Sequence, residues 1–276
     1  MNLMFVLVLL AALFHALWNS IVKASANRLA TMAIIQLTGA AAGLVALPFV
    51  KFPEPASWTF LLATTIVHLL YQVLLVKAYK LGDLSQVYPI ARGSGPMYVT
   101  IFSLIYGEYI STMSLVGIIT ISIGISYLGF YKQLHQFKTV LIALSIGLLI
   151  GIYTILDGLG IRHSDAALGY IAILHILIGA PITLVTRVRL GKNWMQAMRS
   201  AAVPGLIAGT LATVGYGIAL WVAKISPLAY VASLRETSVI IAAGIGAYYF
   251  NESFGKHRII ASVIVVGGMI LLTLGK

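Results

Sequence analysis

Long apolar stretches recur along the whole chain, interrupted only by short segments that hold charges, prolines or clustered glycines. Hydrophobic residues make up 60% of the 276 residues and charged residues only 9%, whereas a soluble domain is nearer half apolar and a quarter charged. So much apolar surface cannot be buried inside one soluble core of this size. The sequence therefore predicts an integral membrane protein and argues against a soluble enzyme.

A membrane span needs about 20 mainly apolar residues. Dividing the chain at charges, prolines and glycine clusters predicts ten spans with short connections and no extramembrane domain. A single segment satisfies its backbone in a bilayer only as a helix, so the predicted fold class is an all-α membrane protein with ten transmembrane helices. The predicted ranges are 3–22, 31–50, 57–79, 84–106, 111–131, 139–158, 168–187, 201–223, 228–250 and 256–274.

The basic residues of the connections are distributed unevenly. Of the 18 Lys and Arg residues, Arg92 and Arg235 fall inside spans, and the other 16 divide twelve to four between the two sides of the membrane. The positive-inside rule predicts that the richer side is cytoplasmic, with both termini outside, in a multi-pass protein of the cell (inner) membrane. The N-terminal stretch lacks the basic segment of a signal peptide and is interpreted as the first span.

Composition and missing motifs narrow the function classes. The net charge of +11 fits lipid headgroups and topology better than nucleic acid, because no basic run stands near aromatic residues. The absence of cysteine removes disulfides and thiolate chemistry. The sequence has no phosphate-binding loop, no zinc or serine-hydrolase motif and no carboxylates at metal-ligand spacing. We therefore expect no metal, no cofactor and no enzymatic activity.

The two halves of the sequence resemble each other. Arg92 and Arg235 are 143 residues apart, and Glu108 and Glu252 follow them at a separation of 144. Each half contains five predicted spans, and an odd number of spans inverts the second copy relative to the first. Inverted repeats around a central site are typical of transporters. The predicted domains are a first five-helix repeat at 1–132 and a second, inverted one at 133–276.

Several features together resemble a known family. They are Trp18-Asn19 in the first span, Gly107-Glu108 and Asn251-Glu252 at the ends of the fourth and ninth, and the Gly-rich fifth and tenth. With these features the whole chain resembles the EamA-type, ten-span members of the drug/metabolite transporter superfamily, although Asn251 stands where glycine is usual. The resemblance implies a carrier of small metabolites, often an exporter, with a central cavity lined mainly by spans one, three, four, six, eight and nine.

Polar side chains at membrane depth are costly and usually face a cavity or a partner. In two spans they share one helix face at i, i+3 and i+4 spacing. The residues predicted to bind substrate are His15, Trp18 and Asn19 of the first span, His68, Tyr71 and Gln72 of the third, Tyr88 and Arg92 of the fourth, Tyr216 of the eighth, and Tyr230, Arg235 and Glu236 of the ninth.

Arg92 leads this set. An arginine near the bilayer midplane costs roughly 2.5–3.5 kcal/mol on insertion scales unless it is paired or hydrated. The sequence offers it no evident acidic partner at its depth, so we expect it to bind an anionic substrate group; permanent pairing inside the protein is the alternative. For Arg235, Asp157 is the candidate structural partner. The prolines and glycines of 89–96 predict a weakened or kinked helix beside Arg92.

Three further groups of residues have predicted roles. Glu236, Asp157 and His68 are candidates for proton coupling, which the sequence leaves open. Glu108 and Glu252 lie at span ends and are predicted to be structural. Glycine pairs at GxxxG spacing indicate close helix packing, in either a monomer or a homodimer.

We therefore expect a secondary active transporter that works by alternating access. Its partners are membrane lipids and a small polar or zwitterionic substrate, similar to an amino acid or an aminophosphonate, and the expected direction is export. A flippase or exporter of lipid-linked or drug-like amphiphiles and a passive pore are alternatives. An intramembrane enzyme would need His15, His68, His175 and Asp157 to converge by packing.

Overall fold

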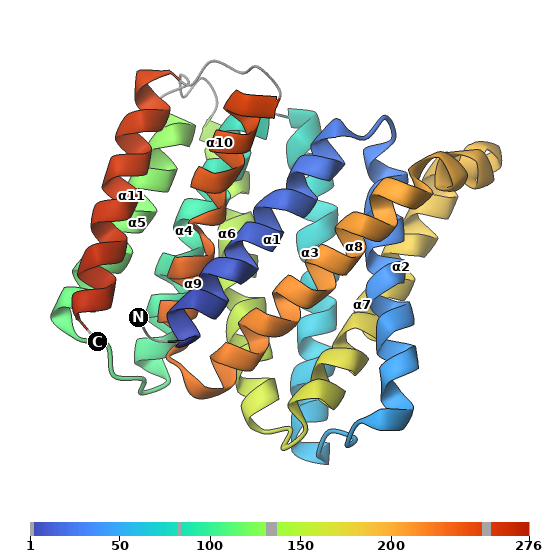
Figure 1. Cartoon of the computed structure of the whole chain (residues 1–276), viewed down its shortest axis with the longest axis horizontal. Coiled ribbons are helices and arrows are strands. Elements are labelled where there is room, and N and C mark those ends of the chain that lie inside the picture. The colour runs from blue at the N-terminus through green and yellow to red at the C-terminus, as the bar shows by residue number, and fades with distance from the viewer. Residues whose placement is uncertain (1–2, 82–83, 131–136, 250–254, 276) are drawn as a thin grey trace. The chain divides into compact units, whose positions relative to one another are not determined.

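The computed structural model describes residues 3–81, 84–130, 137–249 and 255–275, with 76–81, 84–86, 129 and 130 described by their backbone alone. The predicted repeat boundary at 132/133 lies outside these residues. Within them the chain forms eleven α-helices and no strand (Figure 1). The helices are α1 (Leu3–Ala24), α2 (Arg28–Ala46), α3 (Trp58–Leu81), α4 (Leu84–Ile105), α5 (Thr112–Phe130), α6 (Phe137–Arg162), α7 (Ala167–Leu190), α8 (Trp194–Ile225), α9 (Leu228–Arg235), α10 (Ser238–Tyr249) and α11 (Lys256–Leu274).

Seven helical segments within the described residues are long and apolar enough to cross a membrane. One of them, Ala167–Ile225, contains both α7 and α8, and another, Leu228–Tyr249, contains α9 and α10. The predicted all-α membrane fold is therefore confirmed, while the number of ten spans stays a prediction. The helix α8 begins earlier than predicted, at Trp194, because residues 194–200 are mostly good helix formers.

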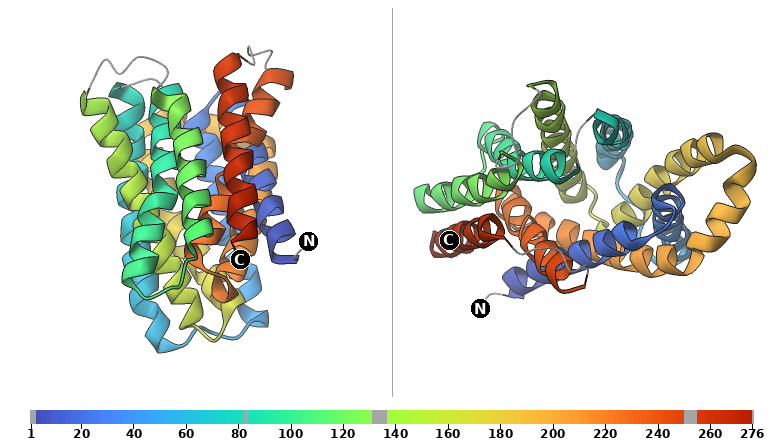
Figure 2. Two further views of the ribbon diagram at one scale, coloured as in Figure 1. Left: turned by 90° about the vertical axis from the view of Figure 1, so that its left-hand side faces the viewer. Right: turned by 90° about the horizontal axis from the view of Figure 1, so that it is seen from above.

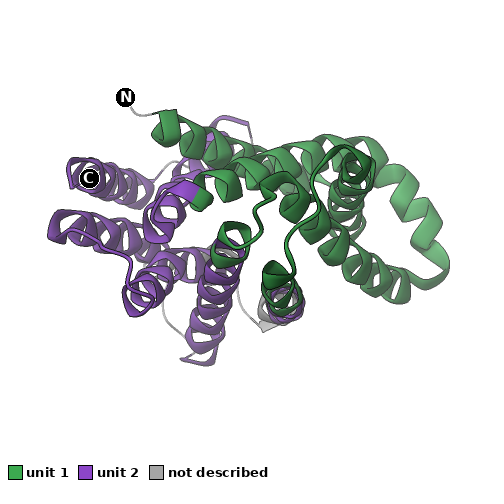
Figure 3. Cartoon of the chain, turned by 90° about the horizontal axis from the view of Figure 1, so that it is seen from below, with its two compact units in different colours: residues 1–65, 159–224 green, residues 66–158, 225–276 purple. Residues whose placement is uncertain are grey.

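The chain divides into two compact units (Figure 3). Unit 1 contains Met1–Thr65 and Leu159–Lys224, and unit 2 contains Ile66–Gly158 and Ile225–Lys276. Each unit takes segments from both halves of the sequence. The two units therefore do not correspond to the predicted repeats at 1–132 and 133–276, and the repeats stay a prediction.

The helices α2 and α7 pack along each other in unit 1 because glycine keeps their backbones close. A Cβ atom at Gly39 would lie 2.7 Å from the His175 ring, and one at Gly43 would collide with the Ala172 carbonyl oxygen. On α8, a Cβ atom at Gly209 would lie 2.6 Å from Thr38 of α2. Glycine at GxxxG spacing thus marks tight packing, as predicted.

In unit 2, α5 packs between α4 and α11, and α4 also contacts α9 (Figures 1 and 2). The contact of α5 with α11 is close, since a Cβ atom at Gly268 would lie 2.8 Å from the Gly117 carbonyl oxygen. If α9 and α10 count as one span, the contacts α2–α7, α4–α9 and α5–α11 each join a predicted span to the span five further along the chain.

The ninth predicted span is interrupted between α9 and α10. Around the interruption the backbone N–H groups of Glu236, Thr237, Val239 and Ile240 donate to carbonyls three residues earlier, which is the tighter 3₁₀ pattern that often marks a hinge inside a helix. The kink predicted for the fourth span stays a prediction. The helix α4 is continuous through Pro89 and Pro96, so a break in a helix is found in the ninth span instead.

Candidate substrate site

A buried ion pair joins two helical segments of unit 2. Arg92 Nε of α4 lies 2.7 Å from Glu236 Oε2, in the turn that follows α9, and each residue is only 4% exposed. The expectation that Arg92 lacks an acidic partner is therefore wrong. It compared the depth of residues along separate spans, whereas α9 packs against α4 and ends at Arg235, so that Glu236 of the following turn meets Arg92.

The guanidinium of Arg92 retains hydrogen-bonding capacity beyond this ion pair. Its Nη2 atom is buried and has no hydrogen-bond partner among the described residues. An unsatisfied buried donor costs about 1–3 kcal/mol, and more when it is charged. Arg92 can therefore donate a hydrogen bond to a further anionic or carbonyl oxygen with a gain in free energy.

Tyrosines surround the ion pair. Arg92 Cζ lies 6.0 Å from the ring centroid of Tyr88, at the distance where a cation is attracted to an aromatic face. Tyr71 and Tyr153 also lie within electrostatic range of Arg92. Such rings provide a polar hydroxyl and a face that attracts cations, and they lose little conformational entropy when they are ordered. The surroundings of the pair are therefore suited to a charged small molecule.

A second ionisable pair lies in the same unit. His68 Nε2 is 3.3 Å from Asp157 Oδ2, and Asp157 is fully buried. The His68 ring stacks on Tyr153, with centroids 4.2 Å apart. Tyr153 was not among the predicted site residues, although its i, i+4 spacing from Asp157 on one helix face is a signal that would have found it. The expected pairing of Asp157 with Arg235 stays a prediction.

The predicted site residues of the first span belong to unit 1. His15 and Trp18 meet edge to face with centroids 5.0 Å apart, and Asn19 Nδ2 donates to the His15 carbonyl oxygen. The three side chains thus share one face of α1, as their spacing predicts. In the same unit, Tyr216 of α8 meets His175 of α7 edge to face. Gln72 of α3, which is partly buried, belongs to unit 2.

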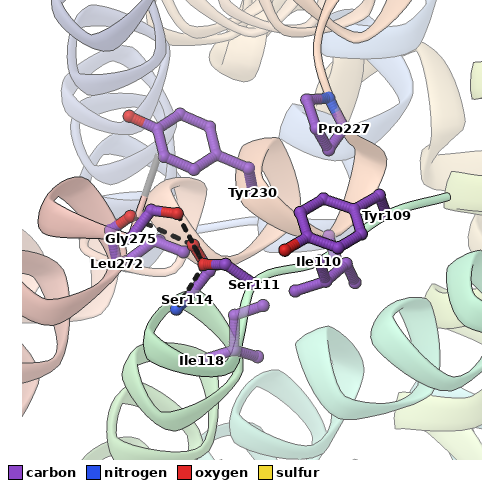
Figure 4. A pocket seen from close by; sticks show the side chains of 10 residues that line it. Tyr109, Ile110, Ser111, Ser114, Ile118, Pro227, Tyr230, Leu272 and Gly275 are labelled. Atoms are coloured by element: carbon purple, nitrogen blue, oxygen red, sulfur yellow. Dashed lines mark hydrogen bonds between the residues drawn. The ribbon is translucent and has the colours of Figure 1, made fainter.

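A small pocket of about 180 Å³ lies in unit 2 near the ends of α5 and α11 (Figure 4). Tyr230 of α9 lines it, and the ion-paired residues of the unit do not. Its two serines are already engaged, since Ser111 Oγ donates to the Gly275 carbonyl and Ser114 Oγ to that of Leu272. The predicted substrate residue Tyr230 thus lies in an apolar pocket rather than among the charges.

Glu108 lies at the N-terminus of a helix. Its Oε2 atom accepts a hydrogen bond from the backbone N–H of Leu228, the first residue of α9, at 3.0 Å. A carboxylate at this position also complements the helix dipole. The structural role of Glu108 stays a prediction. Glu252, the corresponding residue of the second half, lies outside the described residues.

Fold and site together define a helical, multi-pass membrane protein with a charged centre buried among its helices. The sequence model of the EamA-like transporter family matches residues 137–274, which is half of the chain. The chain belongs to the EamA-like transporter family, within the drug/metabolite transporter superfamily.

The fold also resembles that of a solved structure. The chain is similar to a protein of known crystal structure at 19% sequence identity and a TM-score of 0.69, over 99% of this chain and 96% of that one. At this identity the likeness shows the fold alone. Among curated proteins, none matches the sequence.

Proposed function

We propose that this member of the family is a secondary active transporter of a small zwitterionic metabolite, similar to an amino acid or an aminophosphonate. Arg92 and Glu236 are its substrate-binding pair, and the carrier works by alternating access. The observation that carries the proposal is the buried ion pair itself, 2.7 Å between Arg92 Nε and Glu236 Oε2. Export is the direction that the sequence resemblance implies.

The charges around the pair favour a substrate with both signs. Arg92, Arg235, Glu236 and Asp157 all lie within electrostatic range of the Tyr153 phenol, and their formal charges sum to zero. Removing one partner from a buried pair leaves an uncompensated charge, at a cost of about 3–5 kcal/mol. A simple anion that takes Arg92 away from Glu236 incurs this cost, and so does a simple cation. A zwitterion replaces both partners and keeps the sum at zero.

Each end of such a substrate has a group to receive it. Its carboxylate or phosphonate binds the guanidinium of Arg92, where the Nη2 atom has no partner in the described part of the chain; arginine suits planar, bidentate recognition of these groups. Its ammonium binds Glu236 and the face of Tyr88. In the substrate-free carrier, Arg92 and Glu236 neutralise each other, so the empty site tolerates burial.

The interrupted ninth span supports the transport step. Glu236 lies in the turn between α9 and α10, so a substrate that takes over its charge also releases the turn from α4. Discontinuous helices at the interface of two repeats are a feature of carriers that alternate access. The contacts α2–α7, α4–α9 and α5–α11 support an arrangement in which equivalent spans meet. The substrate-binding roles of His15, Trp18, Asn19 and Tyr216 in unit 1, and of Gln72 and Tyr230 in unit 2, stay predictions.

A thermal-shift titration in detergent tests the proposal. The probes are alanine with propionate and ethylamine, and 2-aminoethylphosphonate with ethylphosphonate, so that each zwitterion is compared with molecules that lack one charge. A ligand at 100 times its Kd stabilises the folded state by about 2.7 kcal/mol. We expect a zwitterion to stabilise the wild type, and Arg92→Gln to abolish the shift.

The variant Glu236→Gln gives the sharper result. It removes the negative partner, so the preference should move from the zwitterion toward the anionic probe. The matched control is Arg189→Gln, which changes an exposed arginine near the end of α7. Unchanged binding of the zwitterion by both Arg92→Gln and Glu236→Gln contradicts the proposed site.

A further inference from the structure

His68 and Asp157 form an ionisable pair that the substrate site does not use. Asp157 of α6 is fully buried, whereas the His68 side chain of α3 is 12% exposed. A carboxylate at membrane depth is expensive, and by default it marks a functional group with a nearby partner. Histidine is the side chain whose charge most readily changes near neutral pH. The pair thus combines a fully buried carboxyl group with a histidine side chain that is partly exposed.

We propose that His68 and Asp157 are the proton-carrying site of this transporter. The inference rests on the proposed transport function and adds the coupling ion to it. With a proton bound, an imidazolium lies beside a carboxylate and the pair is neutral. After release, a neutral imidazole lies beside the carboxylate and the pair carries one negative charge. The proton passes between the imidazole nitrogen and water, and no other bond changes.

The groups around the pair connect it to the substrate site. Tyr153 stacks on His68 and meets Tyr71 edge to face, with centroids 5.8 Å apart. The charged and titratable groups within electrostatic range of Tyr153 or of Arg92 are Tyr71 from α3, Tyr88 from α4, Asp157 from α6, and Arg235 and Glu236 from the end of α9 and its turn. A proton on His68 therefore changes the charge of a cluster whose other four charged members balance.

This change of one elementary charge acts on the substrate site at Arg92 and Glu236. The Tyr153 phenol lies within electrostatic range of Asp157 as well as of Arg92 and Glu236. Any group that alters the affinity for substrate must have its own proton affinity altered by the same factor. Proton binding at His68 and substrate binding at Arg92 are thus thermodynamically linked, which is what a proton-driven carrier requires.

The first experiment needs no substrate. Infrared difference spectra of the detergent-solubilised protein are recorded over a pH scan for the wild type, His68→Gln and Asp157→Asn. We expect an imidazole signal that titrates in the wild type, is lost in His68→Gln and moves along the pH axis in Asp157→Asn. The matched control is His163→Gln, a histidine at the end of α6 whose Nδ1 bonds its own helix. Retention of the whole signal in His68→Gln overturns the proposal.

The second experiment measures the linkage. The affinity for alanine and for 2-aminoethylphosphonate is measured against pH. One linked proton changes the affinity by up to about tenfold per pH unit, and we expect this slope to vanish in His68→Gln and to move along the pH axis in Asp157→Asn. An unchanged slope in Asp157→Asn and in His68→Gln overturns the coupling. If neither probe binds the wild type, the proposed substrate class fails, and the infrared experiment still decides the proton site.

Discussion

The two compact units differ in what they bury. All of the buried charged residues in the described part of the chain, Arg92, Asp157 and Glu236, belong to unit 2. Unit 1 buries hydroxyl groups such as that of Thr186, which bonds its own helix through the Ile182 carbonyl. Buried charges are weak stabilisers but suit a site that must exchange partners. The proposed substrate and proton sites, which need such groups, therefore both belong to unit 2.

Removing one charge of the pair gives the largest expected effect. Arg92→Met leaves Glu236 buried without its ion-pair partner and should lower the free energy of unfolding by about 3–5 kcal/mol. Replacing both residues, Arg92→Met with Glu236→Leu, removes the uncompensated charge and should restore most of that loss. Denaturant titration in mixed micelles measures both changes.

The matched control lies in unit 1. Thr186→Val removes a fully buried hydroxyl that bonds only within its helix, and the expected loss is about 1 kcal/mol or less. A double variant as unstable as Arg92→Met alone would show that the two side chains do not act as a pair. An equal loss in Thr186→Val would remove the contrast between the units.

Unit 1 should respond most to a change in packing. Gly43→Ala places a Cβ atom against the Ala172 carbonyl of α7, and a backbone group cannot move aside. Overpacking of this kind costs about 1–3 kcal/mol. The control is Gly217→Ala on α8, where the nearest atom, in the Ile171 side chain, is 3.7 Å away. We expect the control to be neutral or slightly stabilising in the same titration; equal losses would contradict tight α2–α7 packing.

The fold was predictable because the bilayer imposes strong rules. Apolar length and the need to satisfy the backbone are read directly from sequence, and α1, α2 and α11 begin and end close to the predicted limits. The interruption of the ninth span was not predictable, since residues 228–249 contain no proline and no glycine near position 236. The helix α4 continues through two prolines, because neighbouring helices can satisfy the freed backbone groups.

The residues of the candidate site could be predicted one by one, whereas the way in which they pair could not. The free-energy cost of an ionisable side chain at membrane depth identifies four residues individually, namely Arg92, Glu236, His68 and Asp157. Their pairing depends on which helices touch and on the direction in which a turn points a side chain. A comparison of residue depths along separate spans predicted no acidic partner for Arg92. The contact of α4 with α9 nevertheless brings Glu236 to it.

Side chains that accept hydrogen bonds at helix N-termini allow a further comparison of the two units, with smaller expected changes in stability. In unit 2, Glu108 accepts from Leu228 N across 120 residues of sequence. A hydrogen bond to a charged group contributes about 1.5–3 kcal/mol, so Glu108→Ala should lower the free energy of unfolding by an amount near the lower limit. Glu108→Gln keeps an acceptor and should lose less. Equal losses in both variants would assign the effect to charge alone.

The smallest effect is expected where a helix is capped by its own preceding residue. In unit 1, Asn27 Oδ1 accepts from Ala30 N at 3.0 Å and caps α2. Asn27→Ala should lower the free energy of unfolding by about 1 kcal/mol, while Asn27→Asp keeps a side-chain acceptor and most of the stability. Hydrogen exchange at the Ala30 amide should increase in Asn27→Ala, and exchange in α9 should stay unchanged. Faster exchange in α9 as well would show that the two units unfold together rather than as separate bodies.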